Sequence, residues 1–167
     1  MSRLDSFIRR VLAQRDCLSA AATMIDNLPG PILELGLGNG RTYDHLRECL
    51  PNREIFVFDR QVAAHPQCIP DEKHMIIGDI RTTLPGILDK IGAPAVLAHC
   101  DIGTGDKNAS LELAEWLGEA LKPLLAPGAI VVSDQKMTVP GWIPLSLPNG
   151  VPNDRYFMAR VDISKVP

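Results

Sequence analysis

The sequence is poor in the features that identify several classes of protein. Cysteine occurs at only four positions, which are widely scattered and include no C-x-x-C pair, so neither a zinc knuckle nor a thiol redox motif is indicated. No apolar run is long enough to span a bilayer, and Asp5 and Asp16 interrupt the N-terminal arginines where a secretory signal needs an apolar segment. We therefore expect reduced thiols, a cytoplasmic location and no membrane partner.

An excess of positive charge is also lacking. The formal net charge is -3, which gives no general field for attracting phosphate backbones, so we expect no nucleic-acid partner. A chain of 167 residues is long enough for one well-filled core and too short for two ordinary domains. Hydrophobic residues make up 46% of it, which is enough to fill that core. We expect a single domain over residues 29–167, preceded by a helix over residues 1–28.

The N-terminal segment has the periodicity of an amphipathic helix. Its apolar residues recur at intervals of three and four positions, and Arg15 breaks the apolar stripe. Pro29, Gly30 and Pro31 follow and end the helix. We expect the helix to pack on the core through Leu4, Phe7, Ile8, Val11, Leu18, Ala22, Ile25 and Leu28.

After residue 31 the chain alternates short β-rich runs with helical stretches, which is the pattern of a parallel sheet covered by helices on both faces. The fold class is therefore α/β. Pro66 and Pro70 limit the segment 62–73 to a short turn of helix. The predicted strands are 32–35, 54–58, 74–77, 95–100 and 129–133, and the predicted helices are 41–49, 83–91 and 110–125.

The pattern changes beyond Lys136. Residues 142–147 and 155–161 have the composition of strands, and the turn-rich stretch 148–154 between them favours a hairpin. The predicted sheet is therefore Rossmann-like and seven-stranded, with a parallel core followed by an antiparallel C-terminal pair.

A glycine-rich loop joins the first predicted strand, which ends near Glu34, to the helix 41–49. Glycines in such a loop let the backbone turn sharply and approach a ligand. A dinucleotide fingerprint would need its third glycine at position 41, which is Arg41, so NAD is disfavoured. An acidic residue followed by G-x-G-x-G resembles the first motif of class I S-adenosylmethionine-dependent methyltransferases, whose seven-stranded core also matches nearly the whole chain. The loop residues are Gly36, Leu37, Gly38, Asn39 and Gly40.

The resemblance implies roles for this loop and its neighbours. Glu34 would contact the ammonium group of the cofactor, usually through water, and the loop would meet the cofactor's amino-acid portion. Thr42 and Tyr43, which open the next helix, would touch the methionine carboxylate. Helix capping and packing explain these two residues equally well.

Two further motifs follow the next two predicted strands. Asp59 comes after the apolar run 55–58, where an acidic residue that binds the ribose hydroxyls is expected, and a solvated strand-end Asp is the alternative. Gly78, Asp79 and Ile80 resemble the family's third motif. In that motif Asp79 would contact the adenine amino group and Ile80 would pack on the ring.

Candidates for catalysis follow the fourth and fifth predicted strands, because ligands of open α/β sheets bind at the carboxyl ends of the strands. Asp101, Asp134 and Gln135 resemble the site of metal-dependent O-methyltransferases of the catechol and sugar types. That resemblance implies a Mg²⁺ ion that orients and acidifies an acceptor hydroxyl. Gln135 stands where Asn or Asp is commoner, and no general base is assigned. Strand-end capping for Asp134 and packing of the cofactor pocket for Asp101 are the alternatives, and His99 is expected to be a satisfied core residue.

The sequence thus predicts a methyltransferase that transfers the methyl group of S-adenosylmethionine to an oxygen of a small-molecule acceptor. If the resemblance to the metal-dependent enzymes holds, Mg²⁺ would assist this transfer. An NAD-type oxidoreductase and a non-catalytic S-adenosylmethionine-binding module stay open as alternatives. Little sequence is inserted beyond the first helix and the hairpin. We therefore expect a homo-oligomer in which a second subunit completes the lid.

Overall fold

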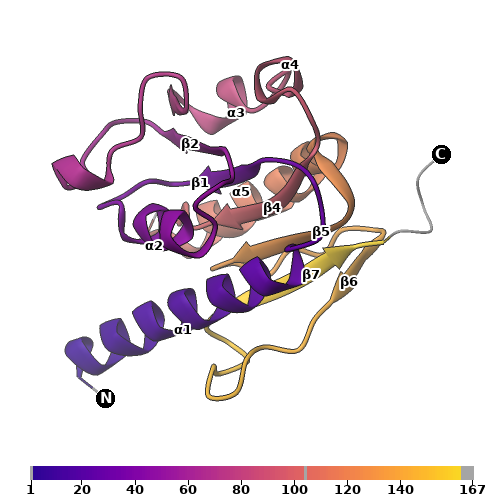
Figure 1. Cartoon of the computed structure of the whole chain (residues 1–167). Helices are drawn as coiled ribbons and strands as arrows, with labels where there is room; N and C mark the ends of the chain where they lie inside the picture. The colour runs from indigo at the N-terminus through magenta and orange to yellow at the C-terminus, as the bar shows by residue number, and fades with distance from the viewer. Residues whose placement is uncertain (1, 104, 163–167) are drawn as a thin grey trace.

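The computed structural model describes residues 2–103 and 105–162, and their main feature is a seven-stranded sheet (Figure 1). The strand order is β3-β2-β1-β4-β5-β7-β6. Strands β1 to β5 run parallel, and β7 runs antiparallel to both β5 and β6, as the sequence predicted. The strands are β1 (Ile32–Leu35), β2 (Ile55–Asp59), β3 (Met75–Ile77), β4 (Ala95–Cys100), β5 (Leu125–Ser133), β6 (Trp142–Pro144) and β7 (Phe157–Val161).

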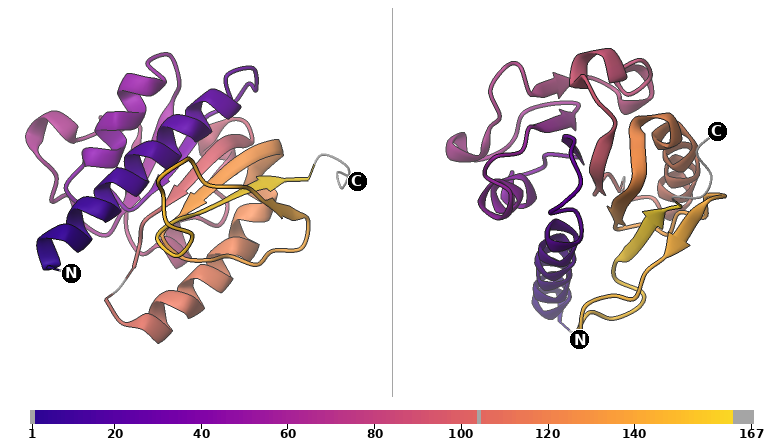
Figure 2. Two further views of the ribbon diagram at one scale, coloured as in Figure 1. Left: turned by 90° about the horizontal axis from the view of Figure 1, so that it is seen from below. Right: turned by 45° about the vertical axis from the view of Figure 1, so that its right-hand side comes forward.

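Helices cover both faces of the sheet (Figure 2). On one face, helices α1 (Arg3–Met24) and α2 (Arg41–Cys49) bury Leu18 and Leu46 against strand residues such as Val132. On the other face, the short helices α3 (Ile80–Thr83) and α4 (Leu88–Ile91) and the longer α5 (Lys107–Leu121) enclose a second apolar cluster around Phe58. Two 3-10 turns, η1 (Pro66–Cys68) and η2 (Lys122–Leu124), complete the elements.

The central strands bring several loops to one edge of the sheet. Every residue of β1 and β4 is buried, which fits their nearly continuous apolar sequence. The parallel ladder continues one residue past several strands, because the amides of Gly36, Gly78, Asp101 and Asp134 donate to carbonyls of neighbouring strands at 2.8–3.1 Å. The predicted site residues after the first five strands therefore start from the same edge.

The single helix predicted over residues 83–91 is wrong. The structure has α3 and α4 there, separated by a turn that contains Pro85 and Gly86. Proline has no N–H to continue a helical ladder, and Gly86 adopts a φ of +76°. The apolar residues Leu84 and Ile87 keep their place in the core although the helix is broken.

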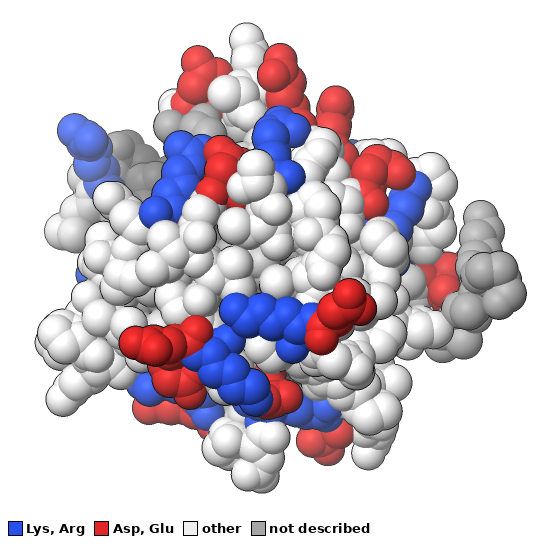
Figure 3. Space-filling model, turned by 90° about the horizontal axis from the view of Figure 1, so that it is seen from above, with Lys and Arg blue, Asp and Glu red and all other residues white. Residues whose placement is uncertain are grey.

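The other differences are at element ends. Helix α1 ends at Met24 instead of residue 28, and α5 begins at Lys107 because the side chain of Asp106 caps the amide of Ala109 at 2.9 Å. Strand β5 begins at Leu125, four residues before the predicted start. No helix of the described residues is long and apolar enough to cross a membrane. On the face shown in Figure 3, basic and acidic side chains are interspersed.

Helix α1 allows a test of its packing on the sheet. We expect Leu18→Ala to lower the free energy of unfolding by about 2–5 kcal/mol, because Leu18 is fully buried and its loss leaves a cavity. The expectation that Leu4, Phe7 and Ile8 pack on the core is wrong, because these residues near the start of the helix are exposed, Leu4 at 66%. Leu4→Ala is therefore the control and should stay within about 0.5 kcal/mol. Denaturant unfolding measures both variants, and equal effects would contradict the packing of α1.

Candidate cofactor site and the carboxylates beside it

A cavity of about 310 Å³ lies at the carboxyl edge of β1 to β4. Its volume is within the range of small-molecule sites. Of the residues that the sequence singled out, it includes Gly36, Gly38, Asp59, Gly78, Ile80 and Asp101. The remaining lining residues are Phe58, Arg60, Ile102, Gly103 and Leu113.

The three glycines of the loop serve different purposes. All have a positive φ, of +101° at Gly36, +51° at Gly38 and +85° at Gly40. A Cβ at Gly36 would meet the carbonyl oxygen of Asp101 at 2.4 Å, and one at Gly40 would meet the Cβ of Cys68 at 2.5 Å. At Gly38, beyond its chain neighbours, no described heavy atom would lie within 4 Å. Gly36 and Gly40 are thus required by the fold, whereas Gly38 leaves bare backbone facing open space.

Asp59 holds this loop in place. Its Oδ2 accepts hydrogen bonds from the backbone amides of Leu37 at 2.9 Å and Gly38 at 3.0 Å. Asp59 also lines the cavity, and a carboxylate has about four lone-pair sites. The side chain can therefore anchor the loop and still accept a hydrogen bond from a ligand hydroxyl.

The motif after β3 is divided between the cavity and the surface. Gly78 and Ile80 line the cavity. Asp79 is exposed and caps α3, with its Oδ1 accepting from the amide of Arg81 at 2.8 Å. The structure therefore gives Asp79 a capping contact and not a place in the cavity wall.

A second cavity, of about 190 Å³, adjoins the first. Helix α1 contributes one wall and the start of α2 another. The two cavities share Gly36, Gly38, Asp101 and Gly103, so one elongated ligand could occupy both. The residues that line only the second cavity are Phe7, Arg10, Val11, Gln14, Leu37, Asn39, Arg41 and Thr42.

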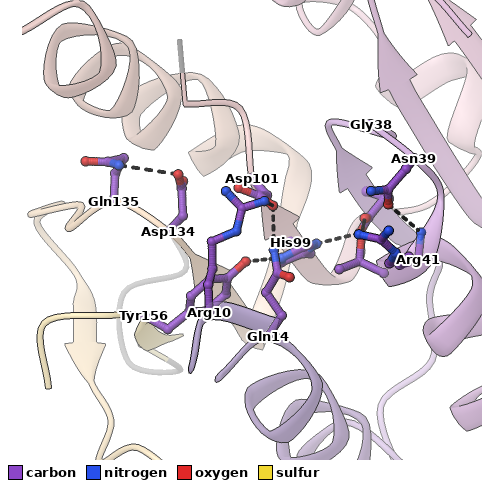
Figure 4. A network of polar contacts seen from close by, with 12 residues as sticks. Arg10, Gln14, Gly38, Asn39, Arg41, His99, Asp101, Asp134, Gln135 and Tyr156 are labelled. Atoms are coloured by element: carbon purple, nitrogen blue, oxygen red, sulfur yellow. Dashed lines mark hydrogen bonds and ion pairs between the residues drawn. The ribbon is translucent and has the colours of Figure 1, made fainter. Parts of the chain in front are cut away.

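Asp101 stands at the junction and is held from α1 (Figure 4). Its Oδ2 accepts from the amide of Gln14 at 2.5 Å, and the Arg10 guanidinium lies 3.8 Å away. Neither α1 residue was among the predicted site residues. A signal was present, since Gln14 follows Val11 by three positions and precedes Leu18 by four, which places a polar side chain on the apolar stripe.

Glu34 lines neither cavity and belongs to a buried polar chain. Its Oε1 accepts from the Thr42 hydroxyl, and its Oε2 lies 2.7 Å from Nδ1 of His99. The other ring nitrogen of His99 lies 2.7 Å from the hydroxyl of Tyr156. Glu34, His99 and Tyr156 are all fully buried. As the sequence suggested, His99 is a satisfied core residue.

The environment favours a charged His99. Burial lowers its pKa, but the charge of Glu34 and the hydrogen bond to it outweigh burial, so the pKa of His99 is raised above its ordinary value. Burial also raises the pKa of Tyr156 well above its ordinary value. A protonated imidazole donates from both nitrogens, to Glu34 on one side and to the oxygen of Tyr156 on the other. Tyr43, also buried, lies under the guanidinium of Arg47 and lines neither cavity.

Of the residues expected to bind a metal, Asp101 lines the two cavities, whereas Asp134 and Gln135 line another pocket. That pocket is small and shares Gly103 with both cavities. Burial, and then the charge of Asp101, raise the pKa of Asp134 there to about 6. Gln135 donates its amide N–H to Oδ2 of Asp134 at 3.3 Å, and Figure 4 shows its amide oxygen on the side away from Asp134. Among the described residues, no three His, Cys, Asp or Glu side chains are grouped as metal ligands. These contacts do not support a Mg²⁺ ion among the described residues.

A family model described as S-adenosyl-L-methionine methyltransferase matches residues 1–161. The chain belongs to this family. The prediction of a class I S-adenosylmethionine-dependent methyltransferase is therefore confirmed. No curated protein matches the sequence of this methyltransferase.

Solved structures agree with this assignment. An S-adenosyl-L-methionine methyl transferase from Silicibacter pomeroyi DSS-3 is 45% identical, with a TM-score of 0.90 over 96% of this chain and 99% of that chain. A putative caffeoyl-CoA O-methyltransferase from Staphylococcus aureus is 13% identical, with a TM-score of 0.57 over 86% and 82%. The plantazolicin methyltransferase BpumL in complex with SAH is 19% identical, with a TM-score of 0.52 over 74% and 46%. The last two resemble the methyltransferase in fold only.

Gly38 gives a test of the site. We expect S-adenosylhomocysteine to raise the melting temperature of the wild type, because a ligand that binds only the folded state stabilises it by mass action. Gly38→Leu should abolish the shift in melting temperature, because the leucine side chain would fill the open space beside the Gly38 backbone. Gly150→Leu is the control, because Gly150 also has a positive φ, of +88°, and lines neither cavity. A full shift in Gly38→Leu would place the ligand elsewhere.

Proposed function

We propose that the methyltransferase binds S-adenosylmethionine across both cavities, with the adenosine in the larger and the methionine end in the smaller, and methylates a small-molecule acceptor at oxygen. The observation that supports this most is the junction of the cavities at Gly36, Gly38, Asp101 and Gly103. The sulfonium, which joins the two halves of the cofactor, would lie there.

The lining residues suit the two halves of the cofactor. Ile80 and Leu113 offer apolar surface for an adenine ring, and Asp59 offers acceptors for ribose hydroxyls. In the smaller cavity, Arg10 and Arg41 offer positive charge for the methionine carboxylate. The Thr42 oxygen would be an acceptor for the ammonium group.

The transfer itself is an in-line displacement. The acceptor oxygen attacks the methyl carbon, the carbon–sulfur bond breaks, and its electron pair stays on sulfur to give S-adenosylhomocysteine. Holding the two reactants in line supplies much of the rate. We assign the role of general base to Asp101, which is the carboxylate that lines both cavities. It takes the proton of the acceptor hydroxyl. This mechanism needs no divalent cation. The cytoplasmic location and the homo-oligomer stay predictions of the sequence.

Asp59 tests the ribose contact. We expect Asp59→Ala to weaken binding of S-adenosylhomocysteine by about 1.5–3 kcal/mol, because both the charged acceptor and its hold on the glycine loop are lost. Asp79→Ala is the comparison and should have a smaller effect, since Asp79 caps α3 outside the cavity wall. Calorimetry measures both, and an equal loss would argue for the adenine contact expected of Asp79.

Asp101 tests the chemical step. With an acceptor found by screening hydroxyl compounds for S-adenosylhomocysteine release, Asp101→Asn should lower kcat by about 10²–10⁴-fold and change cofactor affinity less. Asp89→Asn, an exposed carboxylate on α4, is the control and should be unchanged. Turnover should also survive a chelator.

Two results would contradict this assignment. Full activity of Asp101→Asn would remove the base role. Loss of turnover on chelation, restored by Mg²⁺, would instead support the metal-dependent mechanism. Cofactor binding without product release from any acceptor would favour the non-catalytic module.

A further inference from the structure

We propose that Tyr156 and His99 are positioning residues that act through Glu34 to hold the Thr42 oxygen as an acceptor for the ammonium group of the cofactor. This inference rests on the proposed placement of the methionine end in the smaller cavity. It gives the acidic residue of the glycine motif an indirect role, and it makes a residue from the C-terminal part of the chain a determinant of cofactor affinity.

The sheet builds the central pair of this chain. Glu34 of β1 and His99 of β4 are direct partners in the parallel register, and their side chains meet at 2.7 Å. Tyr156, immediately before β7, closes the other side of the imidazole at 2.7 Å. Moving a carboxylate and an imidazole out of water into the core costs free energy. Such a chain is therefore stable only where its members satisfy one another's hydrogen bonds.

The hydrogen-bond inventory then determines what Thr42 can offer. A hydroxyl has one proton to donate and two lone pairs to accept with. The Thr42 proton is committed to Oε1 of Glu34, whose other oxygen His99 occupies. Thr42 also lines the smaller cavity. If its oxygen meets a ligand there, the oxygen accepts and does not donate, because its proton is already used. An ammonium group is the matching donor, whereas a carboxylate is not.

This changes the expectation for two residues. From the sequence, Thr42 was expected at the methionine carboxylate and Glu34 at the ammonium. The geometry points to Thr42 for the ammonium, with Glu34 behind it. Arg10 and Arg41, in the same cavity, are left to bind the carboxylate.

The test compares three ligands by calorimetry. S-Adenosylhomocysteine carries the ammonium and the carboxylate, its desamino analogue carries the carboxylate alone, and 5′-methylthioadenosine carries neither. Thr42→Val, which removes the hydroxyl at nearly constant volume, should weaken S-adenosylhomocysteine about tenfold and leave the other two unchanged. Thr42→Ser should restore affinity. Thr23→Val is the control, since the Thr23 hydroxyl donates to the carbonyl of Ser19 within its own helix.

Tyr156→Phe tests the C-terminal member of the chain, whose hydroxyl also interacts with Gln14. It removes only the hydroxyl, and we expect a several-fold loss for S-adenosylhomocysteine with no loss for the desamino analogue. His99→Gln should act in the same direction. Equal losses for all three ligands would show a merely structural role, and unchanged affinity for S-adenosylhomocysteine would equally overturn the inference. If the wild type itself binds none of the three ligands, the proposed function fails instead.

Discussion

The pair formed by Glu34 and His99 is the constraint on which the rest of the site depends. Two ionisable side chains occupy adjacent positions on the two central strands, with no exposure to water. Breaking such a pair leaves an uncompensated buried charge, at a cost of about 3–5 kcal/mol. The register of β1 against β4 is therefore tied to this contact, and the loops that leave these strands start from a defined position.

From that position, the loops divide one edge of the sheet into two cavities. Gly36 approaches the backbone of Asp101 so closely that only a glycine fits. This contact brings the loops after β1 and β4 together at the junction that both cavities share. Helix α1 then closes the smaller cavity with Arg10 and Gln14, so the N-terminal segment is part of the site and not only a cover for the sheet.

Much of this could be predicted from the sequence because it depends on local patterns. The buried parallel strands have continuous apolar runs, and the glycine loop has a spacing that excludes the dinucleotide fingerprint. The contacts of Glu34, Gln14 and Tyr156 could not be predicted, because they join residues that are far apart in the chain. The contact between His99 and Tyr156 joins residues 57 positions apart, and that between Gln14 and Asp101 joins residues 87 positions apart. Spacing along the sequence carries no signal for such pairs.

In the proposed mechanism, the contacts of Asp101 also bear on how a carboxylate could lie beside the sulfonium without slowing the reaction. The positive charge on sulfur disappears during the transfer, so an unshielded carboxylate would stabilise the bound cofactor more than the transition state. Gln14 donates to Asp101, and Arg10 lies within 4 Å, so part of this negative charge is offset from α1. The side chain is also 18% exposed, which further screens its field. In that mechanism, Asp101 would orient an acceptor and take its proton. It would attract the sulfonium less strongly than an isolated carboxylate would.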